Sequence, residues 1–363
     1  MAVRTATPTT GWLMRGKDGR LTAYAPAEGG LLRWTETRPG GPEWSGPEQL
    51  VVPGLEPCLS ISQTSKGYVY LTGVRTRTAD DGRTITEVVY ATQFQSGRAP
   101  TPWRSIGTPY GQDWDRAAKI GAPTAVVDAT GLRVFIRNAG GGVCGRAQDA
   151  KGVWGPWTDM KGSNVLDTLS AAADENGRVE LLALTDGFVQ SWRQEQPGGE
   201  LRRVRNIAAK PLAGSSAVAP VGGGRLAHFW RAAADGRLFV HTPDPAADPD
   251  AEARPGPAPL GSLAHGGTGP VAVLRTPIDG QDCTVLAQRA ASGLPAVAAY
   301  PTGESPALAE WSETGEECVG APALALDAQG LIVLAALGAD GALRVARQRA
   351  GERGLSLGHW VRA

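Results

Sequence analysis

The sequence carries no excess of charge of either sign and no long hydrophobic run. Lys plus Arg number 36 and Asp plus Glu number 36, so the formal net charge is zero. A neutral chain has no general attraction to nucleic acid or to an anionic membrane surface. No apolar stretch approaches the roughly 20 residues of a membrane-spanning helix. We therefore expect neither a nucleic-acid partner nor a membrane span.

Cysteine and lysine are also scarce. The four cysteines, Cys58, Cys144, Cys283 and Cys318, lie far apart and form no Cys-x-x-Cys pair. This spacing disfavours a disulfide framework or a structural zinc site and predicts buried, reduced thiols. Only six residues are lysine, the other basic residues being arginine. With abundant Ala, Gly and Pro, this bias is typical of coding in high-GC bacteria.

The beginning of the chain lacks the apolar core of a secretory signal. Residues 1–10 read Met-Ala-Val-Arg-Thr-Ala-Thr-Pro-Thr-Thr, which is too polar and too broken for such a segment. The sequence thus predicts a cytoplasmic protein, and release by a non-classical route stays open. The oligomeric state does not follow from it.

What the chain has in abundance is glycine, and the glycines repeat. One unit recurs: an apolar run, a turn glycine, a second run, another glycine and a third run, often followed by a tryptophan. The first turn glycine falls at Gly19, Gly67, Gly131, Gly177, Gly224, Gly280 and Gly330, and the second at Gly30, Gly82, Gly141, Gly187, Gly236, Gly293 and Gly341. Seven units of about 50 residues account for the chain, which is the period of a propeller blade.

The segments between the glycines are typical of strands, because they are short and bounded by Asp-Gly, Asn-Gly or Gly-Gly turns. The i, i+3, i+4, i+7 pattern of helical repeats is absent. The sequence predicts an all-β, seven-bladed β-propeller with four antiparallel strands per blade. In unit four the strands fall near 168–176, 178–185, 188–195 and 201–208. The approximate blades are 1–53, 54–109, 120–163, 164–209, 210–262, 263–316 and 317–363, within a single domain.

Tryptophans mark the fourth strand of several units, as in Gly152-Val-Trp-Gly-Pro-Trp157. Together with Asp-Gly-Arg-Leu in the second strand, this ending resembles the PLL-like seven-bladed lectins, bacterial propellers of fucose-binding type. The resemblance spans all seven units. It implies clefts between blades that bind fucose or O-methylated sugars and are lined by residues such as Trp44, Trp103, Trp154 and Trp157. Units four and five lack this Trp segment, so the resemblance does not extend to sites there.

Each of these tryptophans also has a structural interpretation, because an indole ring can bury on the order of 150–250 Å² as packing alone. Trp34 and Trp192 on third strands and Trp230 on a second strand are expected in the core. For the four tryptophans of the fourth strands, packing and ligand contact both stay open.

Unit two is enlarged at two places that lie on one face of a propeller. Its strand-two to strand-three turn, residues 74–83, is long and charged, and its exit link, residues 108–119, accounts for most of a 64-residue step between Gly67 and Gly131. Two insertions on one face predict a local wall. Within the link, Asp113, Trp114, Asp115 and Arg116 form the most ligand-like cluster, since an indole packs on a sugar face while Asp and Arg exchange hydrogen bonds with hydroxyls. A solvated loop is the alternative.

Signatures of catalysis and of metal binding are missing. There is no Gly-x-Ser-x-Gly, His-Glu-x-x-His, phosphate-loop or sialidase-type Ser-x-Asp-x-Gly-x-Thr-Trp motif. His228 and His241 could pair across adjacent strands, but a third ligand is not evident. No cofactor, metal or catalytic residue is therefore assigned. Possible channel-lining side chains on first strands recur near a turn, which favours a structural role: Gln63, Asp128, Asp174, Arg275 and Asp327.

Three functions follow from these observations. The first is a non-enzymatic, carbohydrate-binding propeller whose partner is a glycan or other small ligand held in several inter-blade clefts. The second is an enzyme, a lyase, hydrolase or cyclase, with one site on the loop face near blade two; the missing motifs disfavour it without excluding it. The third is a scaffold that binds a protein through the same face or through the Pro-rich segment 243–259.

Overall fold

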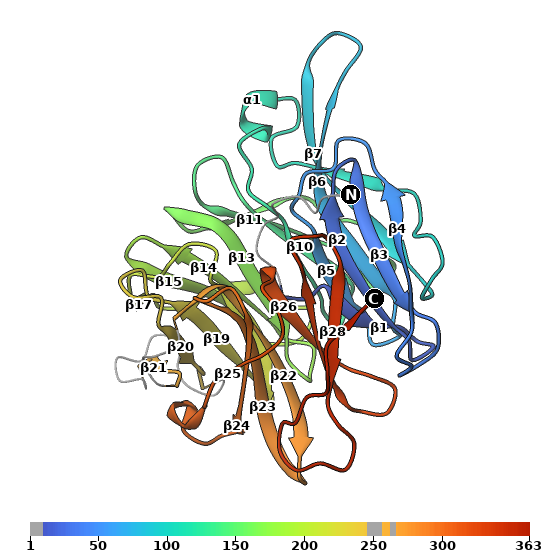
Figure 1. Ribbon diagram of the computed structural model, residues 1–363. Helices are drawn as coiled ribbons and strands as arrows, with labels where there is room; N and C mark the ends of the chain where they lie inside the picture. Colours follow the sequence, from blue (N-terminus) through green and yellow to red (C-terminus); the bar gives the residue numbers. More distant parts are fainter. Residues whose placement is uncertain (1–9, 245–255, 262–265) are drawn as a thin grey trace.

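The computed structural model describes residues 10–244, 256–261 and 266–363. These residues form seven antiparallel sheets, each built from consecutive strands and arranged as blades around a ring (Figure 1). The fold class predicted from the glycine repeat is confirmed. Most of segment 243–259, the acidic Pro-rich stretch, lies outside the described residues, as does His265.

In each of the first three blades, four consecutive strands pair with their neighbours in chain order. Blade 1 contains β1 (Leu13–Arg15), β2 (Leu21–Ala27), β3 (Gly30–Glu36) and β4 (Trp44–Val51); blade 2 contains β5 (Ser60–Gln63), β6 (Val69–Thr78), β7 (Thr84–Gln93) and β8 (Arg104–Gly107); blade 3 contains β9 (Thr124–Val127), β10 (Leu132–Arg137), β11 (Val143–Ala147) and β12 (Thr158–Lys161).

The other four blades repeat this order. Blade 4 contains β13 (Val165–Ala173), β14 (Val179–Thr185), β15 (Phe188–Gln194), β16 (Leu201–Arg203) and β17 (Ile207–Ala208); blade 5 contains β18 (Ala217–Gly222), β19 (Arg225–Arg231), β20 (Leu238–His241) and β21 (Ala258–Pro259); blade 6 contains β22 (Gly267–Ile278), β23 (Gln281–Ala290), β24 (Pro295–Pro301) and β25 (Ser312–Glu313); blade 7 contains β26 (Val319–Leu326), β27 (Ile332–Leu337), β28 (Leu343–Arg347) and β29 (Val361–Arg362). In unit four the predicted fourth strand is divided into β16 and β17, which both pair with β15.

A recurring Asp–Arg pair at the turn between the first and second strands ties each of three blades to the next. Asp174 Oδ1 accepts the backbone N–H groups of Asn176 (2.8 Å) and Arg178 (2.9 Å), which fixes the turn. Arg178 Nη2 then donates to the carbonyl of Gly224 in blade 5 at 2.9 Å.

The same arrangement recurs in two other blades. It joins Asp18 and Arg20 of blade 1 to the Ser96 carbonyl of blade 2, and Asp128 and Arg133 of blade 3 to the Gly198 carbonyl of blade 4. Because the carboxylates of these aspartates accept backbone N–H groups of the turn, the structural role expected for Asp128 and Asp174 is confirmed. In blade 1 this pair belongs to an Asp-Gly-Arg-Leu sequence, residues 18–21.

Tryptophans fill the spaces between blades. Those ahead of or within fourth strands pack against hydrophobic clusters: Trp311 is buried, and five others are half-buried, namely Trp44, Trp103, Trp154, Trp157 and Trp360. Blades 4 and 5, which lack such a residue, instead place Trp192 on β15 and Trp230 on β19 against the preceding blade. Trp34, Trp192 and Trp230 are each 1% exposed, so their predicted place in the core is confirmed.

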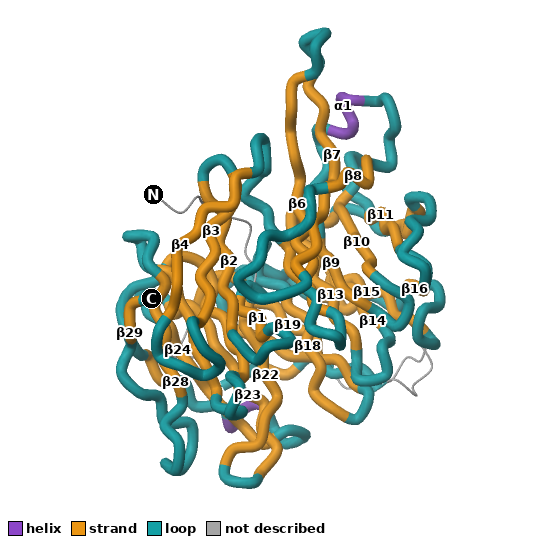
Figure 2. The backbone as a smooth tube through the Cα atoms, turned by 90° about the vertical axis from the view of Figure 1, so that its right-hand side faces the viewer, coloured by secondary structure: helices purple, strands orange, loops and turns teal. Residues whose placement is uncertain are grey.

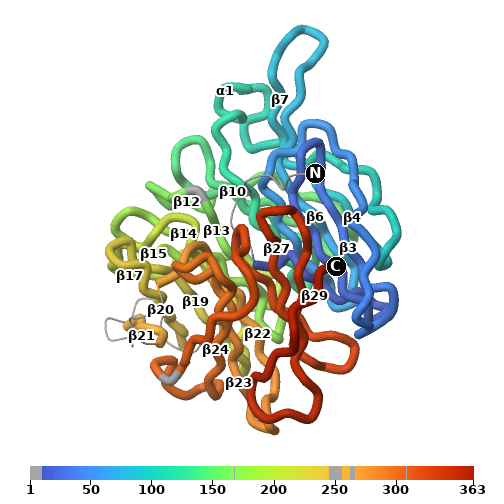
Figure 3. Tube along the Cα trace, viewed as in Figure 1, coloured from blue at the N-terminus to red at the C-terminus, as the bar shows by residue number. Residues whose placement is uncertain are grey.

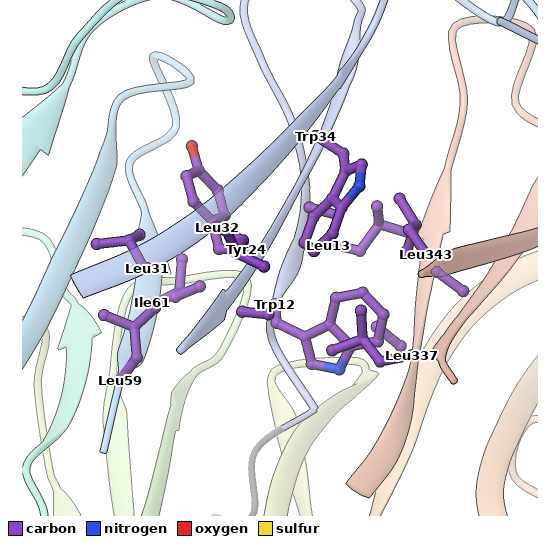
Figure 4. Packing of buried hydrophobic residues seen from close by; sticks show 14 of the residues in the cluster. Trp12, Leu13, Tyr24, Leu31, Leu32, Trp34, Leu59, Ile61, Leu337 and Leu343 are labelled. Atoms are coloured by element: carbon purple, nitrogen blue, oxygen red, sulfur yellow. The ribbon is translucent and has the colours of Figure 1, made fainter. Parts of the chain in front are cut away.

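The ring closes by side-chain packing and hydrogen bonds between blade 1 and blade 7, which lie side by side at the blue and red ends of the chain (Figure 3). Trp12 donates its indole N–H to the Ala321 carbonyl at 3.0 Å. The Arg347 guanidinium of blade 7 pairs with Glu36 of blade 1. Around Trp12 and Trp34, side chains from blades 1, 2 and 7 form one cluster (Figure 4).

Blade 2 carries the projection expected from its two insertions. The sequence predicted a long turn over residues 74–83, but residues 74–78 continue β6 and pair with β7 up to Thr78 and Thr84. Alternating Thr, Arg and Val residues favour such an extended ladder. The resulting hairpin stands above the ring beside α1 (Trp114–Ala117), which packs on β7 (Figure 2). The predicted wall on blade 2 therefore consists of the β6–β7 hairpin and of the exit link that contains α1.

Candidate functional site

An open cleft of about 450 Å³ lies where the exit link of blade 2 passes over blade 3. The link contributes Pro109, Tyr110 and Arg116, and the β10–β11 turn contributes Asn138, Gly140 and Gly142. The outer strands of blade 3 and the residues that flank β12 contribute Cys144, Trp157, Asp159, Lys161 and Gly162. Two of the predicted ligand residues, Arg116 and Trp157, thus meet in one cleft.

Tyr110 and Arg116 form one wall of the cleft as a cation–π pair. The Arg116 guanidinium carbon lies 4.7 Å from the centre of the Tyr110 ring, a cation–π distance. The Tyr110 hydroxyl accepts the backbone N–H of Ala139 at 2.7 Å, which anchors the ring to the β10–β11 turn. The tyrosine therefore holds the arginine head group over the cleft at a defined place.

The floor is a tight glycine-rich turn. Asn138 Oδ1 accepts the backbone N–H groups of Gly140 and Gly142, both at 2.9 Å, so the amide oxygen is occupied by the turn. Gly141, between them, has a φ of 77°, a conformation that glycine adopts without strain. The glycine triplet is a hairpin turn, as the sequence predicted, and it keeps this side of the cleft free of bulk.

Trp157 closes the cleft on the side of blade 2. Its indole N–H donates to the Ile106 carbonyl at the end of β8, at 3.1 Å, and its ring packs against the hydrophobic cluster shared by blades 2 and 3. Because the nitrogen is engaged and the ring is only half-buried, what Trp157 offers to the cleft is apolar aromatic surface. Such a surface suits the C–H face of a sugar ring.

Asp159 and Lys161 supply the polar groups opposite. Asp159 Oδ1 accepts the backbone N–H of Lys161 at 2.9 Å, and its Oδ2 lies 3.2 Å from Lys161 Nζ. The backbone and side-chain hydrogen bonds from Lys161 lower the pKa of Asp159 below its ordinary 3.8, so the carboxylate is ionised at neutral pH. Lys161 itself has a φ of 65°, a left-handed conformation that costs free energy in a residue with a Cβ.

The rest of the predicted cluster lies outside this cleft. Asp113 caps α1, its Oδ1 accepting the backbone N–H of Arg116 at 3.1 Å. Trp114 faces the hairpin, where the Arg83 guanidinium carbon lies 5.6 Å from the centre of its ring. Asp115 is exposed on the first turn of α1. Of these four predicted residues, Arg116 alone lines the cleft.

The other predicted tryptophans lie at inter-blade seams. Trp44 and Trp103 pack against the cluster centred on blade 1. Trp154 packs edge-on against Tyr90 of blade 2, their ring centroids 5.4 Å apart, and the Arg146 guanidinium carbon lies 5.9 Å from its ring centre. All three are half-buried, so each has a packing role and leaves part of its ring accessible.

A second pocket, of about 200 Å³, lies at the mouth of the central channel. The beginnings of the innermost strands and the links that precede them line it, including Ser60, Thr124, Thr168 and Ser216, and no charged side chain belongs to its lining. None of the polar residues considered from the sequence lines this pocket, because Gln63, Asp128, Asp174 and Asp327 come at the other ends of the first strands, and Arg275 is turned to Glu175 and Asp282.

The predicted histidine pair exists. His228 on β19 lies opposite His241 on β20, with ring centroids 6.2 Å apart. His228 Nε2 lies 2.6 Å from a carboxylate oxygen of Glu180 in blade 4, so this side chain joins two blades. Within the described ranges no group of three His, Cys, Asp or Glu side chains suits a metal ion.

Sequence reasoning missed four cleft residues: Tyr110, Asn138, Asp159 and Lys161. Tyr110 stands in the enlarged link, and its aromatic side chain was a usable signal. Asp159 and Lys161 follow Trp157 at steps of two residues, the spacing of one face of a strand, and this spacing was the signal. Asn138 gave none, because its role depends on the turn it stabilises.

No family model matches the chain, and no curated protein matches it. Solved structures do. The BP39L lectin from Burkholderia pseudomallei is 15% identical, with a TM-score of 0.68 over 98% of this chain and 99% of that one. A Hadza microbial sialidase, Hz136, is 12% identical, with a TM-score of 0.53 over 88% and 71% of the two chains. AofleA from Arthrobotrys oligospora is 10% identical, with a TM-score of 0.50 over 84% and 87%.

At these identities the likeness concerns the fold, and the same fold serves a lectin and a sialidase. The described residues contain no helix that is long and apolar enough to cross a membrane. The chain is a seven-bladed β-propeller of four-stranded blades, and a solved lectin matches it over almost the whole length of both chains.

Proposed function

We propose that this propeller is a non-catalytic carbohydrate-binding protein and that the blade 2–blade 3 cleft is one of its binding sites. The observation that carries the proposal is the joining, in one open cleft, of the aromatic surface of Trp157 and Tyr110 with the hydrogen-bonding groups of Arg116, Asp159 and Lys161. Sugars are bound by this combination because a pyranose has an apolar C–H face and a polar rim.

The half-buried Trp44, Trp103 and Trp154 are proposed as further sites of the same kind at other seams. Several weak sites on one rigid ring would give avidity on a glycan-bearing surface. The resemblance of the repeat to the PLL-like lectins favours fucose or O-methylated sugars at those sites.

A hydrolytic function has less support in the cleft. Glycoside hydrolysis ordinarily needs a pair of carboxyl groups, one of them protonated. Asp159 is the one carboxylate among the residues that line the cleft, and its lowered pKa keeps it ionised. The uncharged lining of the channel mouth offers no general acid or base either.

The test is binding of the labelled, folded protein to a glycan array that includes fucosylated and O-methylated sugars, followed by titration with the free sugars found. We expect selective binding with more than one sugar per chain. One ligand per chain, converted to product, would indicate an enzyme. An array on which the folded protein binds no glycan would contradict the proposal.

A further inference from the structure

The cleft residues carry an uneven balance of charge. Arg116 and Lys161 are cationic, and Asp159 is the one anionic residue of the lining. Lys161 already has a partner, since its ammonium lies 3.2 Å from Asp159 Oδ2. The remaining positive charge is on Arg116.

Arg116 is held by a ring and not by a carboxylate. Its guanidinium carbon lies 4.7 Å from the centre of the Tyr110 ring, and it forms no ion pair within the described part of the chain. Its side chain donates no hydrogen bond to another residue of the described ranges, so its five N–H donors are not taken up by the protein. The donors are thus available to a ligand that bears a carboxylate, which an arginine binds with two parallel hydrogen bonds.

A second feature places a cation at the opposite wall. Among the described residues that are not glycine, Lys161 is one of three with a positive φ, the others being Asn164 and Asp279. Strained residues persist where their surroundings or their function require them. In this conformation Lys161 ends β12 beside Trp157 and Asp159, which keeps its side chain at the rim of the cleft.

On this basis, and resting on the proposed carbohydrate function, we infer that the blade 2–blade 3 cleft is selective for acidic sugars, meaning sugar units that bear a carboxylate. The sugar ring packs on Trp157, the carboxylate accepts hydrogen bonds from Arg116, and Asp159 with Lys161 contacts the hydroxyls of the ring. A neutral sugar fits the same surface but leaves the Arg116 donors to water.

The experiment compares two matched pairs of ligands by calorimetric titration: methyl glucuronide with methyl glucoside, and methyl galacturonide with methyl galactoside. Within each pair the sugars differ at C6 alone, where a carboxylate replaces a hydroxymethyl group. We expect at least one acidic sugar to bind about tenfold or more tightly than its neutral counterpart, because a charge-assisted pair is about twice as strong as a neutral hydrogen bond. Raising the ionic strength should reduce the difference, since this cleft is open to solvent.

Two variants assign the preference to the cleft. Arg116→Gln removes the charge and should abolish the difference within a pair, because the acidic sugar loses more affinity than the neutral one. Arg83→Gln is the matched control, because Arg83 faces Trp114 outside the cleft, and it should change neither affinity.

The inference is overturned if neutral sugars bind as tightly as acidic ones, or if Arg116→Gln weakens both members of a pair equally. It is also overturned if neither member of either pair binds while fucosylated or O-methylated glycans bind on the array, an outcome that leaves the carbohydrate function standing. If no glycan binds in either experiment, the proposed function has failed first.

Discussion

Two neighbouring seams of the ring contain the same tryptophan contact with different outcomes. Trp157, ahead of β12, donates its indole N–H to the Ile106 carbonyl of blade 2 at 3.1 Å. Trp192, on β15, donates to the Met160 carbonyl of blade 3 at 2.9 Å. Trp192 is 1% exposed, whereas Trp157 is half-buried and lines a cleft.

Strand position permits the difference without fixing it, since Trp311, ahead of the fourth strand β25, is buried at 9% exposure. The third strand of a blade lies between two others, so the Trp192 ring is covered by side chains of its own blade and of blade 3. The fourth strand is the outer edge, where the ring can be covered on one side and open on the other. The comparison separates a purely structural tryptophan from one that can also bind a ligand.

The largest effect should come from Trp192→Ala. Removing a fully buried indole leaves a cavity between blades 3 and 4, which should lower the free energy of unfolding by about 3–5 kcal/mol. Denaturant titration measures this loss. At a temperature where the variant is folded, sugar affinity of the blade 2–blade 3 cleft should be unchanged; weakened binding there would show that the two seams are coupled.

Trp157→Ala should have the opposite pattern, with a smaller loss of stability and a large loss of sugar affinity. Because its ring is half-buried, the loss of stability should be about 1–3 kcal/mol, while sugar binding at this cleft is lost. Trp157→Phe is the control, since it keeps an aromatic face but not the N–H to Ile106. If the alanine variant folds and binds sugar as the parent does, Trp157 is structural like Trp192.

Lys161→Gly sharpens the comparison by separating stability from binding. Glycine relieves the cost of the positive φ but adds freedom to the unfolded chain and removes an exposed ion pair, so the unfolding free energy should change by less than about 1 kcal/mol. Sugar binding should weaken severalfold. Thermal unfolding and titration with the same ligand measure the two quantities, and unchanged affinity would remove Lys161 from the site.

The smallest effect concerns pH. The pKa of Asp159 is lowered below 3.8 by hydrogen bonds from Lys161, so the carboxylate stays ionised from about pH 8 down to about pH 5. Sugar affinity should be flat over this range and fall only as the pH drops through the lowered pKa. A titration midpoint near neutral pH would mean that another group governs binding.

Much of the architecture was predictable because it depends on local chemistry. Gly19, Gly67 and Gly177 all have φ near 80° in the structure, and such turns are specified by the residues that form them. The histidine pair across β19 and β20 followed from strand register once the turn was placed. The ladder formed by residues 74–78 was missed, because charged and threonine-rich residues suggested a loop although they pair well in a projecting hairpin.

The site was only partly predictable. Arg116 and Trp157 were both predicted as ligand residues and line one cleft, whereas Asp113 caps α1 and Trp114 faces the hairpin. The helical turn of α1 points adjacent side chains in different directions, which a sequence read as a loop does not reveal.

The spacing of the glycines determined the number of blades, their strands and the place of the enlarged second unit. This was possible because the conformation of each turn depends on the residues that form it and not on residues distant in the sequence. The tertiary structure decided which tryptophans are closed and which are open, and it brought the 108–119 link onto β12. That contact joins segments on different blades, and its geometry depends on how the two blades pack, which no local pattern in the sequence records.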